Sequence, residues 1–303
     1  MKNLLSCLVF FVTICTNAIG YFYPIKPRPL RSLINEAEVI IIGQVIETNT
    51  SNRENSWTTD VATIAVKEVL LGDEENESIK VYYTPHMICP APARYPKGSI
   101  VLAFLDKHEG NYITHALSYG SKVLNKEELD LYKSRILEMF EINKENDKSK
   151  KRIKVTDWLV KCAKHRATRW EGTYELSPKS DFMSFYDRNR NKNPYVLNSN
   201  QIKELRDVLF NIEDIDSRDL GLVDIVMESD SDVQMRDFLV DQLKSENVGI
   251  WECEFVMSRI NFIEKKGELA RILTELEEGY NFDDFDAEEE RRKKLIKKFV
   301  ESL

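Results

Sequence analysis

The stretch "EVIIIGQVIE", residues 38–47, decides how the first half of the chain is interpreted. Before Gly43 both alternate faces are apolar and rich in β-branched residues, and after Gly43 apolar and polar residues alternate more cleanly. β-Branched residues favour strands, and a glycine inside a strand often marks a bulge or a bend. The stretch therefore predicts a β-strand with an irregularity at Gly43.

Four more stretches with strand character follow before residue 124, and turn-forming residues separate them. "SIKVYYT" alternates apolar and polar positions as a half-buried strand does. The five predicted strands cover residues 38–47, 61–72, 78–84, 99–105 and 112–120. Short, locally connected strands of this kind are typical of a small antiparallel barrel.

The periodicity changes at Asn125. Asn125 is followed three residues later by Glu128, which is a pattern for a helix start, and apolar residues then recur at helical spacing. Residues 143–152, "NKENDKSKKR", are charged and poorly hydrophobic, so they are the best candidate for a linker. Further helical patterns cover residues 155–163, 202–212, 219–228, 232–245, 252–264, 267–278 and 286–301.

Residues 1–20 have the pattern of a secretory signal peptide. Lys2 precedes an apolar run, and the small residues Ala18 and Gly20 occupy the usual positions before a cleavage site. The run is shorter than the about 20 apolar residues of a membrane span, and no later segment approaches that length. We therefore expect a secreted or periplasmic chain that starts at Tyr21 and has no transmembrane segment.

The motifs "AEVIIIGQV", "VKEVLLG", Cys89-Pro90, "KGSIVLAFL" and "YGSKVL" resemble bacterial exported proteins with a netrin-like domain, related to tissue inhibitors of metalloproteinases. The resemblance covers roughly residues 30–124 and implies a five-stranded OB-type barrel. Inhibitors of that family chelate the protease zinc through an N-terminal cysteine, whereas this chain is expected to begin with Tyr21. Of the matched positions, only Cys89 could be a family disulfide residue.

The fold class expected from these observations is α+β, with an N-terminal five-stranded OB-type antiparallel barrel followed by an all-α domain. The expected domains are a signal peptide (residues 1–20), the barrel domain (21–124), a helix with the charged linker (125–150) and an α-helical domain (151–303).

Three cysteines remain after the predicted leader, namely Cys89, Cys162 and Cys253. Three are too few for a disulfide framework, and an odd number leaves at least one thiol unpaired within a monomer. All three are candidates for a disulfide. Because Cys162 and Cys253 lie on apolar helix faces, two buried thiols and a bridge between two helices both remain open.

The stretch "KHRATRWEGTYELSP", residues 164–178, is the densest polar and aromatic cluster. In one interpretation Trp170 and Tyr174 form a platform that stacks on a sugar or a peptide, and Arg169 binds an anion. In the other, the stretch is a helix end, with Trp170 packed in the core and the charged residues paired with one another.

The other candidate sites in the sequence lack residues that their chemistry requires. His86 lies three residues before Cys89, but further zinc ligands are missing nearby, and the surrounding prolines favour a stiff loop. Residues 187–194, "DRNRNKNP", begin like a calcium loop but lack its essential glycine and glutamate. No GxSxG, Walker, HExxH or GxGxxG motif occurs. We therefore predict no catalytic residue, no metal and no cofactor.

The formal net charge is −8, and the charge balance offers no concentrated basic field for phosphates, so nucleic acid is not an expected partner. The leading hypothesis is a non-enzymatic exported binding protein of the bacterial envelope whose partner is a protein or peptide. The alternatives are a carbohydrate-binding module, a protease inhibitor without the N-terminal cysteine device, and an exported hydrolase of unrecognised type.

Overall fold

The structure, a computed structural model, describes residues 26–50, 60–85, 91–108, 110–189, 195–227, 229–279 and 283–303. The predicted signal peptide, His86 and Cys89 lie outside these residues. The chain divides into a barrel unit and a helical unit, the latter comprising Pro29–Arg31 and Asp130–Leu303. A barrel followed by helices confirms the predicted fold class.

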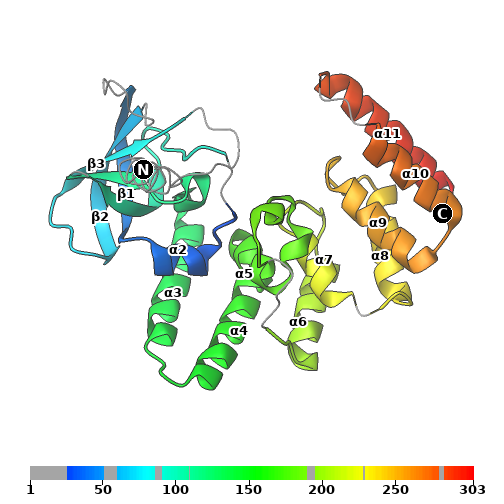
Figure 1. Cartoon of the computed structure of the whole chain (residues 1–303), viewed down its shortest axis with the longest axis horizontal. Coiled ribbons are helices and arrows are strands. Elements are labelled where there is room, and N and C mark those ends of the chain that lie inside the picture. Colours follow the sequence, from blue (N-terminus) through cyan, green and yellow to red (C-terminus); the bar gives the residue numbers. More distant parts are fainter. Residues whose placement is uncertain are drawn as a thin grey trace, which may run out of the picture. The chain divides into compact units, whose positions relative to one another are not determined.

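Six strands form the described part of the barrel unit (Figure 1). They are β1 (Val39–Thr50), β2 (Asp60–Leu71), β3 (Ser78–Tyr83), β4 (Ile100–His108), β5 (Asn111–Thr114) and β6 (Ser121–Val123). Two helical elements accompany them, α2 (Leu30–Glu36), whose first turn belongs to the helical unit, and the 3-10 helix η1 (Leu117–Gly120).

Five strands close into a ring in the order β1-β2-β3-β5-β4, and β4 then pairs with β1. All these pairs are antiparallel except β3 with β5, where Val81 lies opposite Tyr112 in a parallel pair. The short β6 pairs antiparallel with Val101 to Ala103 of β4, next to the part of β4 that pairs with β5. A five-stranded ring of this kind is an OB-type barrel.

β1 has two different environments along its length. From Ile40 to Gln44 it pairs with both β2 and β4, and Val39 to Gly43 are buried. Beyond Val45 it pairs only with β2 and becomes exposed. The ladder with β2 shifts register between Ile42 and Gly43, which confirms the predicted irregularity. A Cβ on Gly43 would lie 2.4 Å from Cγ2 of Ile64, so the strands meet there without room for a side chain.

The last predicted strand is shorter than expected. β5 ends at Thr114, and the chain then turns through Ala116 and Leu117, which have φ angles of 55° and 57°. The turn ends at Gly120. Only glycine fits there, because a Cβ at that position would lie 1.8 Å from the carbonyl oxygen of His115. Close backbone packing thus interrupts a stretch whose side chains alone suit a strand.

Among its described residues the helical unit contains nine α-helices, counting α3, which starts in the barrel unit, and three 3-10 helices. They are α3 (Lys126–Asn143), α4 (Lys148–Lys164), η2 (Arg166–Thr168), α5 (Arg169–Leu176), η3 (Pro178–Ser180), η4 (Phe182–Tyr186), α6 (Ser199–Phe210), α7 (Leu220–Val226), α8 (Val233–Lys244) and then α9 (Cys253–Glu264), α10 (Gly267–Glu278) and α11 (Phe285–Glu301).

The predicted linker is largely helical. α3 ends at Asn143 and α4 starts at Lys148, so the two form a helical hairpin. The Asp147 side chain caps α4 by accepting hydrogen bonds from the backbone N–H groups of Ser149 and Lys150. The linker prediction was based on composition alone. The helix extends into the charged stretch because Asp147 caps it and the residues that follow in α4 are buried.

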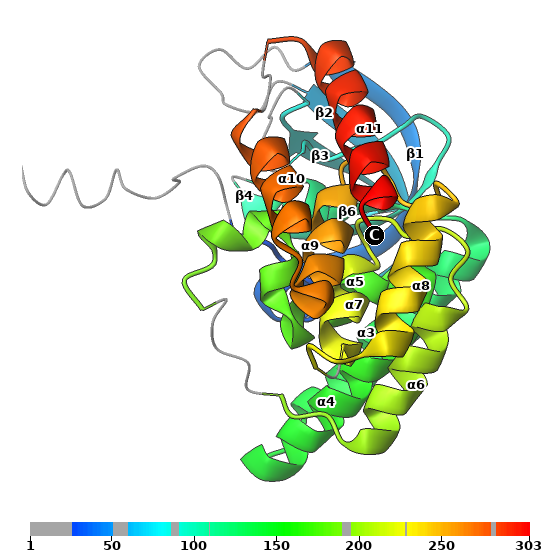
Figure 2. The same cartoon turned by 90° about the vertical axis from the view of Figure 1, so that its right-hand side faces the viewer.

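The start of α3 follows the sequence pattern. The Asn125 side chain accepts from the Glu128 N–H at 2.9 Å, and the Glu128 carboxylate accepts from the Asn125 N–H at 3.1 Å. This reciprocal pair is a capping box. Farther along, helices α6 to α11 share a core that includes Leu205, Val256 and Phe299, and Figure 2 shows α8 to α11 packed together. No helix in the described part of the chain is both long and apolar enough to span a membrane.

The close contact at Gly43 predicts that adding even a methyl side chain at this position destabilises the barrel. Gly43→Ala should lower the free energy of unfolding of the barrel by about 1–3 kcal/mol, because the added methyl group overlaps Ile64 and the Ala65 carbonyl. Differential scanning calorimetry of the full chain measures this change. Gly267→Ala is the matched control, since a Cβ there meets nothing within 4 Å, and it should be neutral or slightly stabilising. Equal effects of the two substitutions would contradict the packing argument.

Candidate functional site

The polar and aromatic cluster predicted at residues 164–178 runs from the end of α4 through η2 to α5, and α5 packs closely against α4. A Cβ on Gly172 would lie 2.3 Å from the Leu159 carbonyl oxygen and 2.6 Å from the Ala163 nitrogen. Only glycine permits this approach of the two helices. Side chains of α5 near Gly172 are therefore drawn into the interior of the helical unit.

Arg169 is buried rather than displayed. Its side chain is 6% exposed and forms an ion pair with Asp219, whose side chain is fully buried. The Arg169 Nε group also donates to the Ala163 carbonyl at 3.2 Å, and Asp219 accepts from the backbone N–H of Asp216 at 3.0 Å. With its charge already neutralised inside the protein, Arg169 has no exposed face for the anion that the sequence suggested.

Trp170 and Tyr174 hold the chain that follows α5. The Trp170 Nε1 group donates to Asp181 at 2.6 Å, and the Tyr174 hydroxyl donates to Asp187 at 3.0 Å. Tyr174 is 4% exposed, so it cannot form the open stacking platform that the sequence suggested. Burial raises the pKa of the Asp181 carboxyl above its ordinary value, although hydrogen bonds from Trp170 and two backbone N–H groups act in the opposite direction.

The hydrogen bonds to Asp181 and Asp187 position a short segment that exposes two aromatic side chains other than Trp170 and Tyr174. Asp181 and Asp187 flank the short 3-10 helix η4, and Asp181 caps it by accepting from the Met183 N–H. On η4, Phe185 is 70% exposed and Tyr186 is 40% exposed. Their ring centres lie 5.6 Å apart, with the planes at 88°. We call Phe185 and Tyr186 the aromatic pair.

The aromatic pair was not predicted from the sequence. A signal does exist in "SDFMSFYD", residues 180–187, where three aromatic residues stand between aspartates without helical or strand periodicity. Apolar residues without such a period have no regular face to bury, so some of them are left at the surface.

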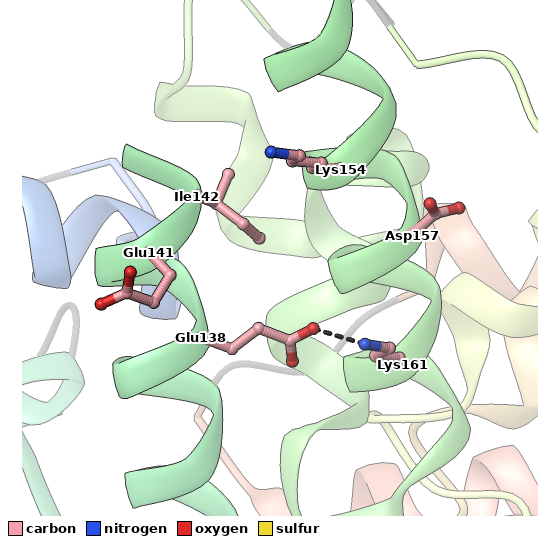
Figure 3. A pocket seen from close by; sticks show the side chains of 6 residues that line it. All are labelled: Glu138, Glu141, Ile142, Lys154, Asp157 and Lys161. Carbon is pink, nitrogen blue, oxygen red and sulfur yellow. Dashed lines mark hydrogen bonds and ion pairs between the residues drawn. The ribbon is translucent and has the colours of Figure 1, made fainter. Parts of the chain in front are cut away.

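A groove of about 300 Å³ lies between α3 and α4 (Figure 3). It is lined by Glu138, Glu141, Ile142, Lys154, Asp157 and Lys161. Its charged groups are matched within the helical unit, as Glu138 pairs with Lys161, Lys154 pairs with Glu145 at 2.7 Å, and Asp157 accepts from Gln201 at 2.7 Å. Paired side chains of this kind hold the helical hairpin together and provide no nucleophile beside a base.

A second polar cluster belongs to the barrel unit. His115 follows β5, and its Nδ1 lies 2.8 Å from Asp106 on β4. Its Nε2 lies 3.5 Å from Glu36 at the end of α2, and Glu36 also pairs with Arg28 at 2.6 Å. The distance of 3.5 Å makes the Glu36 contact a charge attraction rather than a strong hydrogen bond. His115 thus lies between two carboxylates from different elements.

The ionisation of His115 argues against a catalytic role. Burial favours the neutral imidazole, but the Asp106 and Glu36 carboxylates outweigh it and raise the pKa of His115 to about 9. An Asp–His pair is also found in catalytic triads, where the imidazole accepts a proton from a nucleophile. The His115 ring is already protonated at neutral pH, and its second nitrogen faces a carboxylate instead of a nucleophile.

Cys162 and Cys253 are free and buried, so they do not form the bridge between helices that the sequence left open. Burial raises the pKa of the Cys162 thiol, and it raises the pKa of Cys253 to about 12. Both are therefore core thiols rather than reactive groups. Within the described ranges, no group of three or more His, Cys, Asp or Glu side chains is arranged to hold a metal ion.

No known protein-family model and no curated protein matches this chain. Its function is therefore inferred from its own surfaces. Among the surfaces described above, the aromatic pair is the one that exposes large apolar groups from a fixed position.

The charge cluster at His115 predicts how stability depends on pH. Because the folded-state pKa is raised from 6.5 to about 9, the contribution of His115 is full below about pH 6.5 and is lost as the pH rises through about 9. His115→Gln should therefore destabilise the protein most at pH 6 and progressively less toward pH 10. Urea unfolding across this range measures the difference. His108→Gln, at an exposed histidine, should keep the wild-type profile, whereas a pH-independent effect of His115→Gln would refute the assignment.

The buried ion pair predicts an asymmetry between single and double substitutions. Asp219→Ala should cost about 3–5 kcal/mol, because it leaves the Arg169 charge buried without its partner. The double variant Arg169→Met/Asp219→Leu should recover most of that loss in chemical denaturation. As a control, Arg166→Ala removes a more exposed pair with Asp216 and should cost less than about 1 kcal/mol. Similar losses for Asp219→Ala and Arg166→Ala would show that burial does not govern these pairs.

Proposed function

We propose that this chain is a non-enzymatic binding protein that recognises a protein or peptide partner through the aromatic pair, Phe185 and Tyr186. The observation that carries the proposal is their exposure, 70% and 40%, on one short 3-10 helix. Large aromatic side chains dominate the energetics of protein interfaces, where tyrosine and phenylalanine are enriched. Exposing two of them side by side has no benefit for the fold, because apolar surface is better buried.

The pair is also held in place before any partner arrives. Hydrogen bonds from Trp170 to Asp181 and from Tyr174 to Asp187 tie both ends of η4 to α5. A surface that is already ordered loses less conformational entropy when it binds. The contacts of Trp170 and Tyr174 therefore support binding indirectly, by positioning the residues that touch the partner.

The geometry of the rings favours a peptide over a sugar. A stacking sugar needs one broad, flat aromatic face, whereas the two rings here cross at 88°. Crossed rings present an edge beside a face, and this arrangement suits the irregular apolar side chains of a peptide. The nearby Tyr174, which could have extended a flat face, is buried.

We further propose that the protein acts after export, in the bacterial envelope. The pattern of residues 1–20 supports export. The OB-type barrel is the fold that the netrin-like resemblance implies, and it supports placing the barrel unit in that group. The expected start at Tyr21 supports a function other than zinc chelation by an N-terminal cysteine.

The proposal predicts that partner capture depends on the aromatic pair. Tagged mature protein is used to capture partners from envelope extracts, and the bound proteins are compared by quantitative mass spectrometry. Phe185→Ser/Tyr186→Ser should reduce the specific partners by at least tenfold, because two hot-spot side chains are each worth about 2 kcal/mol or more.

Phe262→Ser is the matched control for this experiment. Phe262 is 50% exposed on α9, so the substitution removes a comparable aromatic group from another surface of the helical unit. It should leave the captured partners unchanged. Retention of all partners by the double variant, or an equal loss with Phe262→Ser, would refute the role of the aromatic pair.

A further inference from the structure

The closed end of the α3–α4 hairpin concentrates positive charge in an acidic protein. We call residues 144–154 the basic tip. It contains six cations, Lys144, Lys148, Lys150, Lys151, Arg152 and Lys154, against two carboxylates, Glu145 and Asp147, which is a net charge of +4. The whole chain has a net charge of −8, so composition alone conceals this local concentration.

Only some of these cations form ion pairs within the described part of the chain. Lys144 pairs with Glu141 and Lys154 with Glu145. In contrast, Lys148, Lys150 and Arg152 are exposed and form no ion pair with any residue that the structure describes. These three residues form the available charge of the basic tip.

The position of these cations works against the helix that carries them. The first turn of α4 contains no acidic residue and begins with Lys148. A helix N-terminus carries a partial positive charge, so acidic side chains stabilise it and cations weaken it. Lys154 pairs with Glu145, and Lys151 donates to the Asn143 carbonyl at the end of α3, so these two cations help to hold the hairpin. Lys148, Lys150 and Arg152 make no such contact through their charged groups in the described residues and do not stabilise the helix start.

An apolar side chain accompanies the charge. Ile153 is 62% exposed, although isoleucine is among the residues most often buried. It lies three residues after Lys150 on the same helix, so the two side chains are neighbours on its surface. Long lysine and arginine side chains can lie beside such a group and still keep their charges in water.

We propose that the basic tip docks the protein on an anionic phospholipid membrane. Lys148, Lys150 and Arg152 contact lipid phosphates, and Ile153 enters the boundary between headgroups and acyl chains. Clusters of cations beside exposed apolar residues bind anionic membranes in this way. The site involves neither residue of the aromatic pair and does not depend on the proposed function.

The position of the tip fits a broad, flat surface. In both views the joined ends of α3 and α4 lie at an extremity of the helical unit, with α6 the neighbouring helix (Figures 1 and 2). A projecting end can reach a membrane without interference from the rest of the unit. A small anion would need an enclosed site, and the groove on this hairpin is lined by acidic groups as well as lysines.

The acidic remainder of the chain does not prevent this docking. Electrostatic interactions are screened beyond about 8 Å at physiological ionic strength, so a membrane senses mainly the charges nearest to it. The same screening acts on the tip itself when more salt is added. Docking through lysine and arginine should therefore weaken as the salt concentration rises.

Cosedimentation of the full chain with lipid vesicles tests the proposal. The vesicles contain either phosphatidylcholine alone or phosphatidylcholine mixed with phosphatidylglycerol, which supplies the anionic headgroups. The wild type should bind the anionic vesicles at least tenfold more strongly, and 0.5 M salt, on the order of three times physiological ionic strength, should abolish the preference. Equal binding to both kinds of vesicle, or no binding to either, would overturn the proposal.

Substitutions assign the binding to the tip. Lys148→Glu/Lys150→Glu/Arg152→Glu should reduce the partition coefficient by at least a hundredfold, since each cation near the surface contributes about fivefold. The control Lys80→Glu/Lys203→Glu/Lys294→Glu makes the same change in net charge at exposed lysines on three separate elements and should reduce binding far less. Equal losses in the two triple variants would show a general charge effect and refute the site.

Two further measurements separate the parts of the proposal. Ile153→Ser should weaken vesicle binding several-fold without changing its dependence on salt, because it removes only the apolar contact. A soluble polyglutamate peptide serves as the probe for an acidic protein partner. If the wild type binds this peptide through the same cations but ignores anionic vesicles, the tip recognises acidic protein segments and the membrane proposal is wrong.

Discussion

The barrel depends on one strand, β1, which pairs with β2 on one side and with β4 on the other. Both ladders form over the same few residues, Ile40 to Gln44, and the strand is buried from Val39 to Gly43. Closure also requires the strand to shift register at Gly43, where the neighbouring backbone leaves no space for a Cβ. The apolar run and the glycine therefore serve one purpose, which is to join the first strand to the fourth and remove the open edges of the sheet.

The helical unit has an apolar core, but it also contains charged side chains that are paired with one another in its interior. Arg169 and Asp219 are buried together, and Glu288 on α11 is fully buried while it accepts from Arg291 and Arg292. A buried pair of this kind adds little net stability, but losing one partner is costly. Polar residues that look like a ligand site in the sequence can therefore be parts of the interior, and this is the outcome for Arg169.

Features set by local pattern were predictable, and features set by contacts distant in sequence were not. The β1 irregularity at Gly43 and the capping box of Asn125 follow from neighbouring residues, and the structure confirms both. The parallel pairing of β3 with β5 could not be predicted, because nothing within either strand specifies its partner. The same holds for the site: the sequence located the Trp170 region, but the partner Asp181, which determines that η4 exposes Phe185, is identified only by the fold.

The surfaces proposed for binding share a property that the other polar clusters lack. His115 between its carboxylates, and the paired charges of the α3–α4 groove, are explained by packing and by internal neutralisation. Packing and internal neutralisation do not explain the exposed aromatic rings on η4. They also do not explain Lys148, Lys150 and Arg152, which form no ion pair with the residues that the structure describes and do not stabilise the start of α4. Local departures from folding rules are where function is expected, because a sequence selected for stability alone would remove them.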